Sequence, residues 1–243
     1  MNLSYNFLTR DSLKNSDIDE MFDLMKHSYE NVEYSDFLKD LGKKQYVGLL
    51  TTDDRRIAGF TTFVVREFNG SEHFDVLFSG DTIIGNSFRG TQELIRGVGR
   101  SFGSFLAKSE SNNKELFWLL TTKGHRTYMY LPLFFRTYYP DQTEEYASYY
   151  RERLNAVCSQ LFPDSWAPDQ GLLIHDAAAS KLNSQEALAT HQRNRNPHVE
   201  YFLRRNPDFQ AGTELACIAQ ISVDNIISFG KKYVLDGLEN PLC

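Results

Sequence analysis

Residue types that bind anions gather where an apolar run meets a helical pattern. The run 72–85 (EHFDVLFSGDTIIG) has the composition of a strand. Small and polar residues follow it before the helical pattern begins, namely Ser87, Arg89, Gly90 and Thr91. The first N–H groups of a helix have no partners within the helix, and the helix dipole adds partial positive charge there. The junction is therefore predicted to hold a phosphate or pyrophosphate, although such glycines can also serve close packing alone.

A second Arg-Gly pair lies further along, inside the helical pattern. Arg96, Gly97 and Gly99 follow one another closely. A glycine lowers helix propensity by up to about 1 kcal/mol relative to alanine. These glycines therefore indicate either a close approach by backbone or ligand, or a loop in part of this region.

Further cationic side chains follow the short run 115–122 (ELFWLLTT), which has the pattern of a strand buried on both faces. Ligands of open sheets gather beyond the ends of strands. Lys123, His125 and Arg126 stand at that position and could hold a phosphate or a carboxylate. A solvated loop that begins a helix is the alternative.

Composition limits the class of protein. The chain has 243 residues, of which 41% are hydrophobic and 24% charged, as in a soluble globular protein. A net charge of −6 argues against a general nucleic-acid-binding protein. No run approaches the roughly 20 apolar residues that span a bilayer, and the first residues lack the apolar segment of a signal peptide. Cys158, Cys217 and Cys243 match no metal-ligand spacing. We therefore expect a cytoplasmic protein with no membrane span and no metal.

Periodicity predicts the elements that must position these residues. Strands are expected at 3–8, 45–52, 57–68, 72–84, 115–122, 198–203 and 214–222. Helices are expected at 18–29, 34–41, within 91–108, at 126–138, within 140–162 and at 224–237. This order indicates an α+β fold, with a mixed, mostly antiparallel twisted sheet flanked by helices and a helical insertion before the last two strands. We expect a core at 1–140, a helical cover at 141–197, and a segment at 198–243 that completes the same domain.

This order of elements, with a phosphate-binding type of loop between the fourth strand and the next helix, resembles the GCN5-related N-acetyltransferase (GNAT) superfamily. The resemblance covers residues 1–140, with 198–222 as the last two strands. The signature of that superfamily is an Arg/Gln-x-x-Gly-x-Gly/Ala loop that holds the pyrophosphate of acyl-coenzyme A. Arg89 opens the sequence RGTQEL, which lacks both later glycines, whereas Arg96-Gly97-Val98-Gly99 fits better by letter but lies late after the strand. Three possibilities stay open: the first loop binds with side chains replacing the glycines, the second loop binds, or the ligand differs.

The aromatic stretch 118–140 and the segments RRNPDF and GTELACIAQISVDN resemble the long-chain N-acyl amino acid synthases and acyl-homoserine-lactone synthases within this group. That resemblance implies a fatty acyl donor carried by coenzyme A or acyl carrier protein. The acceptor would be an amine of an amino acid, a small molecule or a peptide. An ordinary acetyltransferase and a non-catalytic protein that binds an acyl thioester are the alternatives.

The resemblance also implies roles for individual residues. Backbone N–H groups of residues 79–84 would polarise the thioester carbonyl. Asp81 is the favoured general base, with His73 and Asp75 as alternatives. Tyr138 is the favoured proton donor to the leaving thiolate, although other tyrosines lie in the same zone, namely Tyr128, Tyr130 and Tyr139. An acyl pocket could be lined by Phe117, Trp118, Phe134 and Phe135, which would be core residues in most folds.

Overall fold

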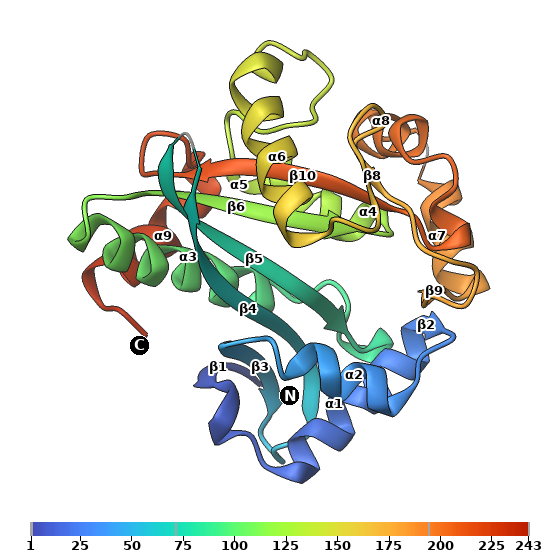
Figure 1. Cartoon of the computed structure of the whole chain (residues 1–243). Helices are drawn as coiled ribbons and strands as arrows, with labels where there is room; N and C mark the ends of the chain where they lie inside the picture. The colour runs from blue at the N-terminus through green and yellow to red at the C-terminus, as the bar shows by residue number, and fades with distance from the viewer. Residues whose placement is uncertain (1, 71, 194, 243) are drawn as a thin grey trace.

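A single large sheet runs through the computed structural model, which describes residues 2–70, 72–193 and 195–242 (Figure 1). Within those residues the sheet has eight strands in the order β1-β3-β4-β5-β6-β10-β8-β7. Their bounds are Leu3–Thr9 (β1), Tyr46–Thr52 (β3), Ile57–Asn69 (β4), His73–Ile84 (β5), Glu115–Thr122 (β6), Glu214–Ile221 (β10), Leu172–Leu173 (β8) and Trp166–Ala167 (β7). Neighbouring strands pair antiparallel, except that β5 and β6 run parallel. The predicted α+β fold with a mostly antiparallel sheet is confirmed.

Helices cover both faces of the sheet (Figure 1). On one face α3 (Glu93–Ser111) packs along α9 (Ser228–Glu239). The other face is covered by α1 (Asn15–Ser28), α2 (Tyr34–Leu41) and α6 (Ala147–Leu161). The short helices α4 (His125–Tyr128) and α5 (Tyr130–Phe134) follow β6, where the sequence predicted helix at 126–138 with a kink or new turn possible at Pro132.

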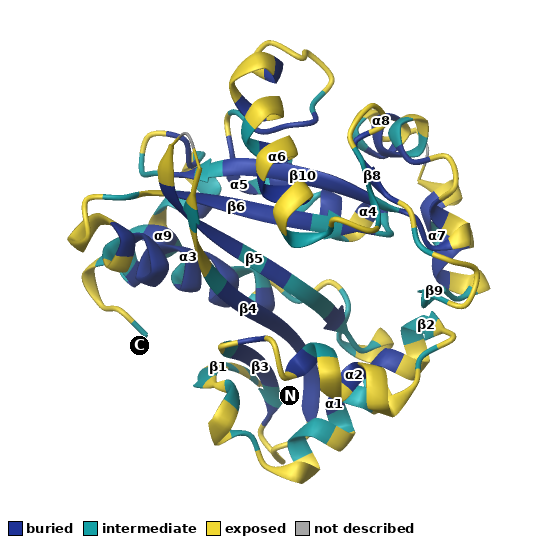
Figure 2. Cartoon of the chain, in the orientation of Figure 1, coloured by how far each residue is buried: buried dark blue, intermediate teal, exposed yellow. Residues whose placement is uncertain are grey.

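Alternation along β6 shows why the sheet carries a core on each face. Phe117 and Leu119 belong to the cluster under α6, whereas Trp118 and Leu120 belong to the larger cluster under α3. All of these side chains are buried, and Figure 2 shows β6 buried along almost its whole length. A strand covered on both faces reads as a continuous apolar run, as predicted for this segment.

The sheet opens between β5 and β6. The parallel ladder joins Phe74–Ser79 to Glu115–Leu120 and ends there. Beyond Ser79, β5 pairs only with β4, while the end of β6 pairs only with β10. A bulge lies at this point, because Gly80 and Asp81 together stand opposite Thr62 of β4. The two strands therefore part where the sequence predicted the active end of β5.

The insertion reaches back to the N-terminal half of the chain. A two-stranded sheet joins β2 (Tyr29–Glu30) to β9 (Lys181–Leu182). Asn183 Nδ2 donates to the carbonyl oxygen of His27 at 2.8 Å, and the helix α7 (Ser184–Gln192) follows directly. The insertion also supplies β7 and β8 to the main sheet. The partition into core, cover and completing segment remains a prediction.

One predicted strand is wrong. Residues 198–203 lie in the helix α8 (Pro197–Arg205), so residues 198–222 supply one strand of the sheet, β10, and not two. Asn196 Oδ1 accepts a hydrogen bond from the N–H of His198 at 2.9 Å, and Pro197 occupies the first turn. An Asn cap followed by Pro is a helix-start signal, and it outweighs the short apolar alternation that favoured a strand.

Candidate functional site

A cleft of about 460 Å³ lies between the C-terminal ends of β5 and β6. The end of β5 forms one wall, and the loop before α3 continues it. The segment 124–130 after β6 forms the opposite wall, and α7 contributes Glu186 and Thr190. The cleft thus lies where the sequence predicted a ligand beyond the strand ends.

The loop between β5 and α3 brings part of the predicted anion site to the cleft. Arg89, Gly90 and Thr91 all line it, whereas Ser87 is exposed and lies outside the lining. Gly90 has a φ of +89°, a conformation that L side chains rarely adopt. The helix α3 begins at Glu93, so its first N–H groups lie directly after this loop. A turn and a helix start together are an arrangement that can bind an anion.

The second Arg-Gly pair does not form a loop. Arg96, Gly97 and Gly99 lie inside α3. A Cβ on Gly97 would overlap the ring of Tyr5, and one on Gly99 would lie 2.9 Å from Cβ of Tyr233. The expectation that these glycines line a phosphate loop is therefore corrected, because they allow the helix to pack closely against its neighbours.

Three arginines reach the cleft from different elements. Arg89 comes from the loop after β5, Arg126 from α4, and Arg193 from the end of α7. Arg89 and Arg126 both donate to the carboxylate of Glu186. Lys123 is not in the lining: its Nζ donates to Ser180 Oγ at 2.9 Å and lies 3.4 Å from Glu214 Oε1. Of the three residues predicted after β6, the structure brings His125 and Arg126 to the cleft and leaves Lys123 outside its lining.

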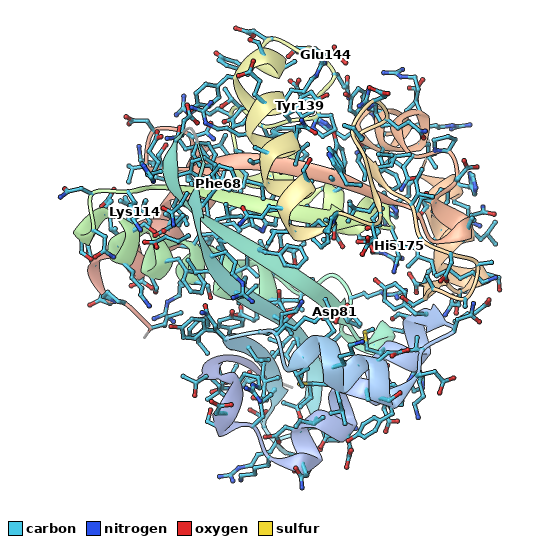
Figure 3. The ribbon with its side chains drawn as sticks, viewed as in Figure 1. Phe68, Asp81, Lys114, Tyr139, Glu144 and His175 are labelled. Carbon is cyan, nitrogen blue, oxygen red and sulfur yellow. The ribbon has the colours of Figure 1, made fainter. Side chains whose placement is uncertain are left out.

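Asp81 lies on the bulge at the sheet opening (Figure 3). Asp81 is not among the residues that line the cleft, whereas its neighbour Thr82 is. Burial raises the pKa of Asp81 to about 6. The carboxylate of Asp40 adds to this shift, and the ammonium groups of Lys44 and Lys123 oppose it. A carboxylate with this pKa is ionised at neutral pH and basic enough to take a proton.

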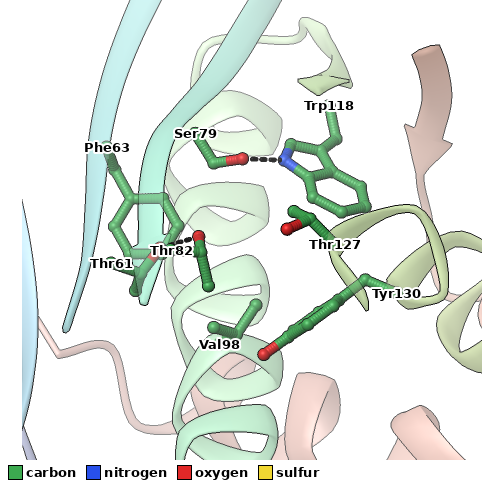
Figure 4. Close-up of a pocket in the computed structure, with 8 residues that line it drawn as sticks. All are labelled: Thr61, Phe63, Ser79, Thr82, Val98, Trp118, Thr127 and Tyr130. Carbon is green, nitrogen blue, oxygen red and sulfur yellow. Dashed lines mark hydrogen bonds between the residues drawn. The ribbon is translucent and has the colours of Figure 1, made fainter. Parts of the chain in front are cut away.

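A small recess lies at the base of the opening, on the α3 side (Figure 4). Its volume is about 10 Å³. Trp118 Nε1 donates to Ser79 Oγ at 2.8 Å, and the hydroxyls of Thr61 and Thr82 lie 2.9 Å apart. The remaining lining residues are Phe63, Val98, Thr127 and Tyr130. Since Thr82, Thr127 and Tyr130 also line the cleft, the recess lies next to it.

Tyr130 lines the cleft and Tyr138 does not; Tyr29 of β2 lines it as well. Tyr138 is buried, its hydroxyl lies 3.5 Å from His198 Nδ1, and its ring packs edge-on against Tyr128. Tyr130 lines both the cleft and the recess, and burial raises the pKa of its hydroxyl. The hydroxyl of Tyr130 is therefore protonated throughout the physiological range.

His73 lies at the far end of β5. It is exposed beside the hairpin, with Nδ1 3.1 Å from Asn69 Oδ1. Figure 3 shows Asp81 at the end of β5 remote from Phe68 and this hairpin. A strand rises about 3.3 Å per residue, so His73 and Asp81 are roughly 25 Å apart. The expectation that His73 belongs to the site is therefore wrong.

Residues of the insertion complete the cleft and were missed from the sequence. Glu186 is buried, and Thr190 Oγ1 lies 2.9 Å from Nδ1 of His125. Burial lowers the pKa of His125 to about 4, with a further contribution from Arg126 and Arg193, so this imidazole is neutral at physiological pH. The Asn183 cap signals the start of α7, but no local pattern indicates that this helix lies over the cleft.

Comparisons with known proteins return distant structural likenesses. No protein-family model matches the sequence, and a search of the curated proteins gives no match. A conserved protein of unknown function from Enterococcus faecalis, described as a probable N-acyltransferase, is 16% identical over 57% of this chain and 33% of its own, with a TM-score of 0.42. The GNAT family N-acetyltransferase YhbS from Escherichia coli, in complex with CoA, is 14% identical over 51% of this chain and 65% of its own, with a TM-score of 0.36. Glucosamine-6-phosphate N-acetyltransferase from Arabidopsis thaliana is 16% identical over 48% of this chain and 81% of its own, with a TM-score of 0.32. The chain thus spans less than two thirds of the length of the first two.

Two further properties concern residues 2–70, 72–193 and 195–242. No helix among them is both long and apolar enough to cross a membrane. No group of three or more His, Cys, Asp or Glu side chains is placed there to hold a metal ion. Cys158 and Cys217 are buried free thiols, and Cys243 lies outside the described residues.

Proposed function

We propose that this chain is an N-acyltransferase of the GNAT type, which moves an acyl group from a coenzyme A thioester to an amine. The observation that supports it most is the opening of the sheet beyond Ser79, with an anion-binding loop on one side and Asp81 on the other. The pyrophosphate would bind at Arg89–Thr91 and the start of α3. The thioester would then lie along the end of β5. A carrier-protein thioester would use the same opening without the nucleotide.

The open part of β5 supplies the polarising groups in this proposal. Backbone N–H groups of a strand alternate between its two neighbours. Up to Ser79 half of them face β6, and beyond Ser79 the N–H groups on that side of β5 face the opening. N–H groups fixed in this way can stabilise the negative charge that develops on the thioester carbonyl oxygen.

Proton movements complete the reaction. The amine nitrogen attacks the carbonyl carbon, the new C–N bond forms and the C–S bond breaks. Asp81 accepts the proton that the amine loses, since its raised pKa leaves it ionised but basic. The thiolate takes a proton from the Tyr130 hydroxyl, which lines the cleft and the recess. Solvent then returns a proton to the Tyr130 oxygen and takes the one held by Asp81.

The positions of the aromatic residues limit the length of acyl chain that the site can hold. The predicted pocket residues Phe117, Phe134 and Phe135 are packed in the cores and do not line the cleft. Trp118 closes the recess, whose 10 Å³ corresponds to about one water-sized group. This supports a short acyl group such as acetyl, whereas the fatty acyl group predicted from the sequence would have to lie along the larger cleft.

The proposal is tested with acyl-CoA donors from C2 to C16 and a pool of amino acids, small amines and peptides. Free thiol release is followed at each chain length, together with product mass. Amine-dependent release with a covalent amide product supports transfer. Binding of acyl-CoA without turnover favours a non-catalytic acyl-thioester-binding protein. Preference for C10–C16 over C2 donors would contradict the short-acyl reading.

A further inference from the structure

Glu186 joins the two sides of the cleft. Its Oε1 accepts from Nη2 of Arg89, in the loop after β5. Its Oε2 accepts from Nη1 of Arg126, in α4 after β6. The Glu186 residue is 4% exposed, so this carboxylate is buried between two guanidinium groups that come from opposite walls.

The insertion holds this carboxylate in place independently of the arginines. Asn183 Oδ1 accepts from the N–H of Glu186 at 2.9 Å and so fixes the first turn of α7. Thr190 Oγ1 donates to the carbonyl oxygen of Glu186 at 3.2 Å and lies 2.9 Å from His125 Nδ1 of α4. Helix α7 is therefore docked on α4 through a contact that does not involve the arginines.

Both arginines keep the capacity to bind a ligand. Their side chains are 29% and 41% exposed, and a guanidinium carries five N–H donors. A ligand that took both arginines away from Glu186 would leave a buried, unpaired carboxylate, which is strongly unfavourable. A phosphate is therefore expected to share Arg89 and Arg126 with Glu186 and not to displace it.

We propose that Glu186 is a positioning residue for the donor, which holds Arg89 and Arg126 at the spacing that receives the pyrophosphate of coenzyme A. This inference rests on the proposed function of the cleft. An arginine side chain has many rotamers, and a partner that fixes it before binding reduces the entropy lost on binding. Removing the negative charge would by itself strengthen anion binding, so the two effects of substitution have opposite signs.

The test compares the full chain with its Glu186→Gln variant. A glutamine amide can accept from one guanidinium, but its NH₂ group faces the other with donor against donor. Affinities for coenzyme A and for pantetheine, which lacks the pyrophosphate, are measured by calorimetry. We expect a roughly tenfold loss of affinity for coenzyme A with little change for pantetheine. Circular dichroism checks that the variant is folded.

Matched variants separate this role from a structural one. Glu30→Gln removes another carboxylate at the junction with the insertion, 3.6 Å from Lys181 Nζ, and should leave both affinities unchanged. In an Arg89→Ala background, Glu186→Gln should lower the affinity for coenzyme A less than it does in the parent chain. Part of the effect of Glu186 acts through Arg89, which this background lacks.

Each outcome decides between the possibilities. Tighter coenzyme A binding by Glu186→Gln would show that the Glu186 carboxylate competes with the phosphate for the two arginines, and would overturn the inference. Unchanged affinity, or equal losses for both ligands, would also overturn it. If the parent chain itself binds no coenzyme A, the proposed function is refuted, and the inference about Glu186 falls with it. The two failures are therefore distinguished by the parent chain alone.

Discussion

Trp118 Nε1 donates a 2.8 Å hydrogen bond to Ser79 Oγ at the last point where β5 and β6 are paired. Ser79 stands opposite Leu120 in the parallel ladder, and the next residues of β5 pair with β4 alone. The same two side chains form the wall of the recess (Figure 4). The contact therefore lies where the sheet parts and also bounds the space available to an acyl group.

Replacing Ser79 with alanine should destabilise the fold. The substitution leaves the buried indole N–H of Trp118 without its acceptor, which costs about 1–3 kcal/mol. Urea unfolding measures the free energy of unfolding. Ser4→Ala, on the exposed edge strand β1, is the control and should stay within about 0.5 kcal/mol of the parent. Equal stability of the two variants would show that the Trp118 contact contributes nothing.

Asp81→Asn should lower turnover while the protein stays folded. General-base groups contribute typically about 10²–10⁴-fold to rate, so a loss of at least about 10²-fold is expected. In the parent chain, turnover should rise with pH through about 6, where Asp81 loses its proton, and then level off. Steady-state rates across pH 4.5–8.5 provide the measurement.

Asp75→Asn on the same strand is the matched control for that experiment. The carboxylate of Asp75 accepts from Ser109 Oγ at 2.8 Å and lies 3.7 Å from Lys114 Nζ, so its role is structural. This variant should lose stability and keep its turnover per folded molecule. Parent-like rates in Asp81→Asn, or a large rate loss in Asp75→Asn, would remove Asp81 from the role of base.

The same Asp81→Asn substitution should stabilise the protein at high pH. The pKa of Asp81 is raised from 3.8 to about 6 in the folded state, so the folded state favours the protonated carboxyl. The stability that this proton contributes is complete below about pH 4 and is lost as the pH rises through about 6. Asparagine is neutral throughout, so the variant should gain about 3 kcal/mol over the parent at pH 8 and much less at pH 4. A gain that is the same at both pH values, measured by urea unfolding, would contradict the assigned cause.

Most of the fold follows from local pattern. Residues 115–122 form a strand and residues 34–41 a helix, as the periodicity predicts. The failure at 198–203 has a local cause: Val199, Tyr201 and Leu203 alternate as in a strand, but the Asn196-Pro197 cap before them starts α8. Longer patterns predict the type of element correctly, because a long run of alternating or continuous apolar residues can be buried in few ways.

The site could be predicted only where the backbone alone determines it. Arg89 and Arg126 follow β5 and β6, and parallel strands bring their C-terminal ends to one edge, so both reach the cleft. Glu186 reaches the same cleft from a distant insertion, through a β2–β9 pairing that has no sequence signature. His73 was misplaced because a strand carries its two ends far apart, and only one end of β5 lies at the opening.

Gly103→Ala should push apart α3 and α9, which pack together on one face of the sheet. A Cβ on Gly103 would overlap the carbonyl oxygen of Val234 in α9, and backbone atoms of Leu238 and Gly237 lie next to it. Because backbone cannot rotate away, we expect a loss of about 1–3 kcal/mol or more. Thermal unfolding compares it with Lys108→Ala, an exposed position of the same helix, which should change little. Parent-like stability of Gly103→Ala would show that α3 and α9 pack less closely than described.

Arg89→Ala and Arg96→Ala distinguish the loop from the helix interior as the donor site. Arg89 lines the cleft, whereas Arg96 does not: it donates to Glu93 at 2.7 Å and to the lining residue Gln92 at 3.1 Å. Charge-assisted phosphate contacts are lost in the first variant only, so KM for acyl-CoA should rise roughly tenfold with kcat nearly unchanged. Arg126 still pairs with Glu186 in that variant, which should keep α7 in place. A rise in KM confined to Arg96→Ala would move the phosphate to the second turn of α3 and refute the assignment of the loop.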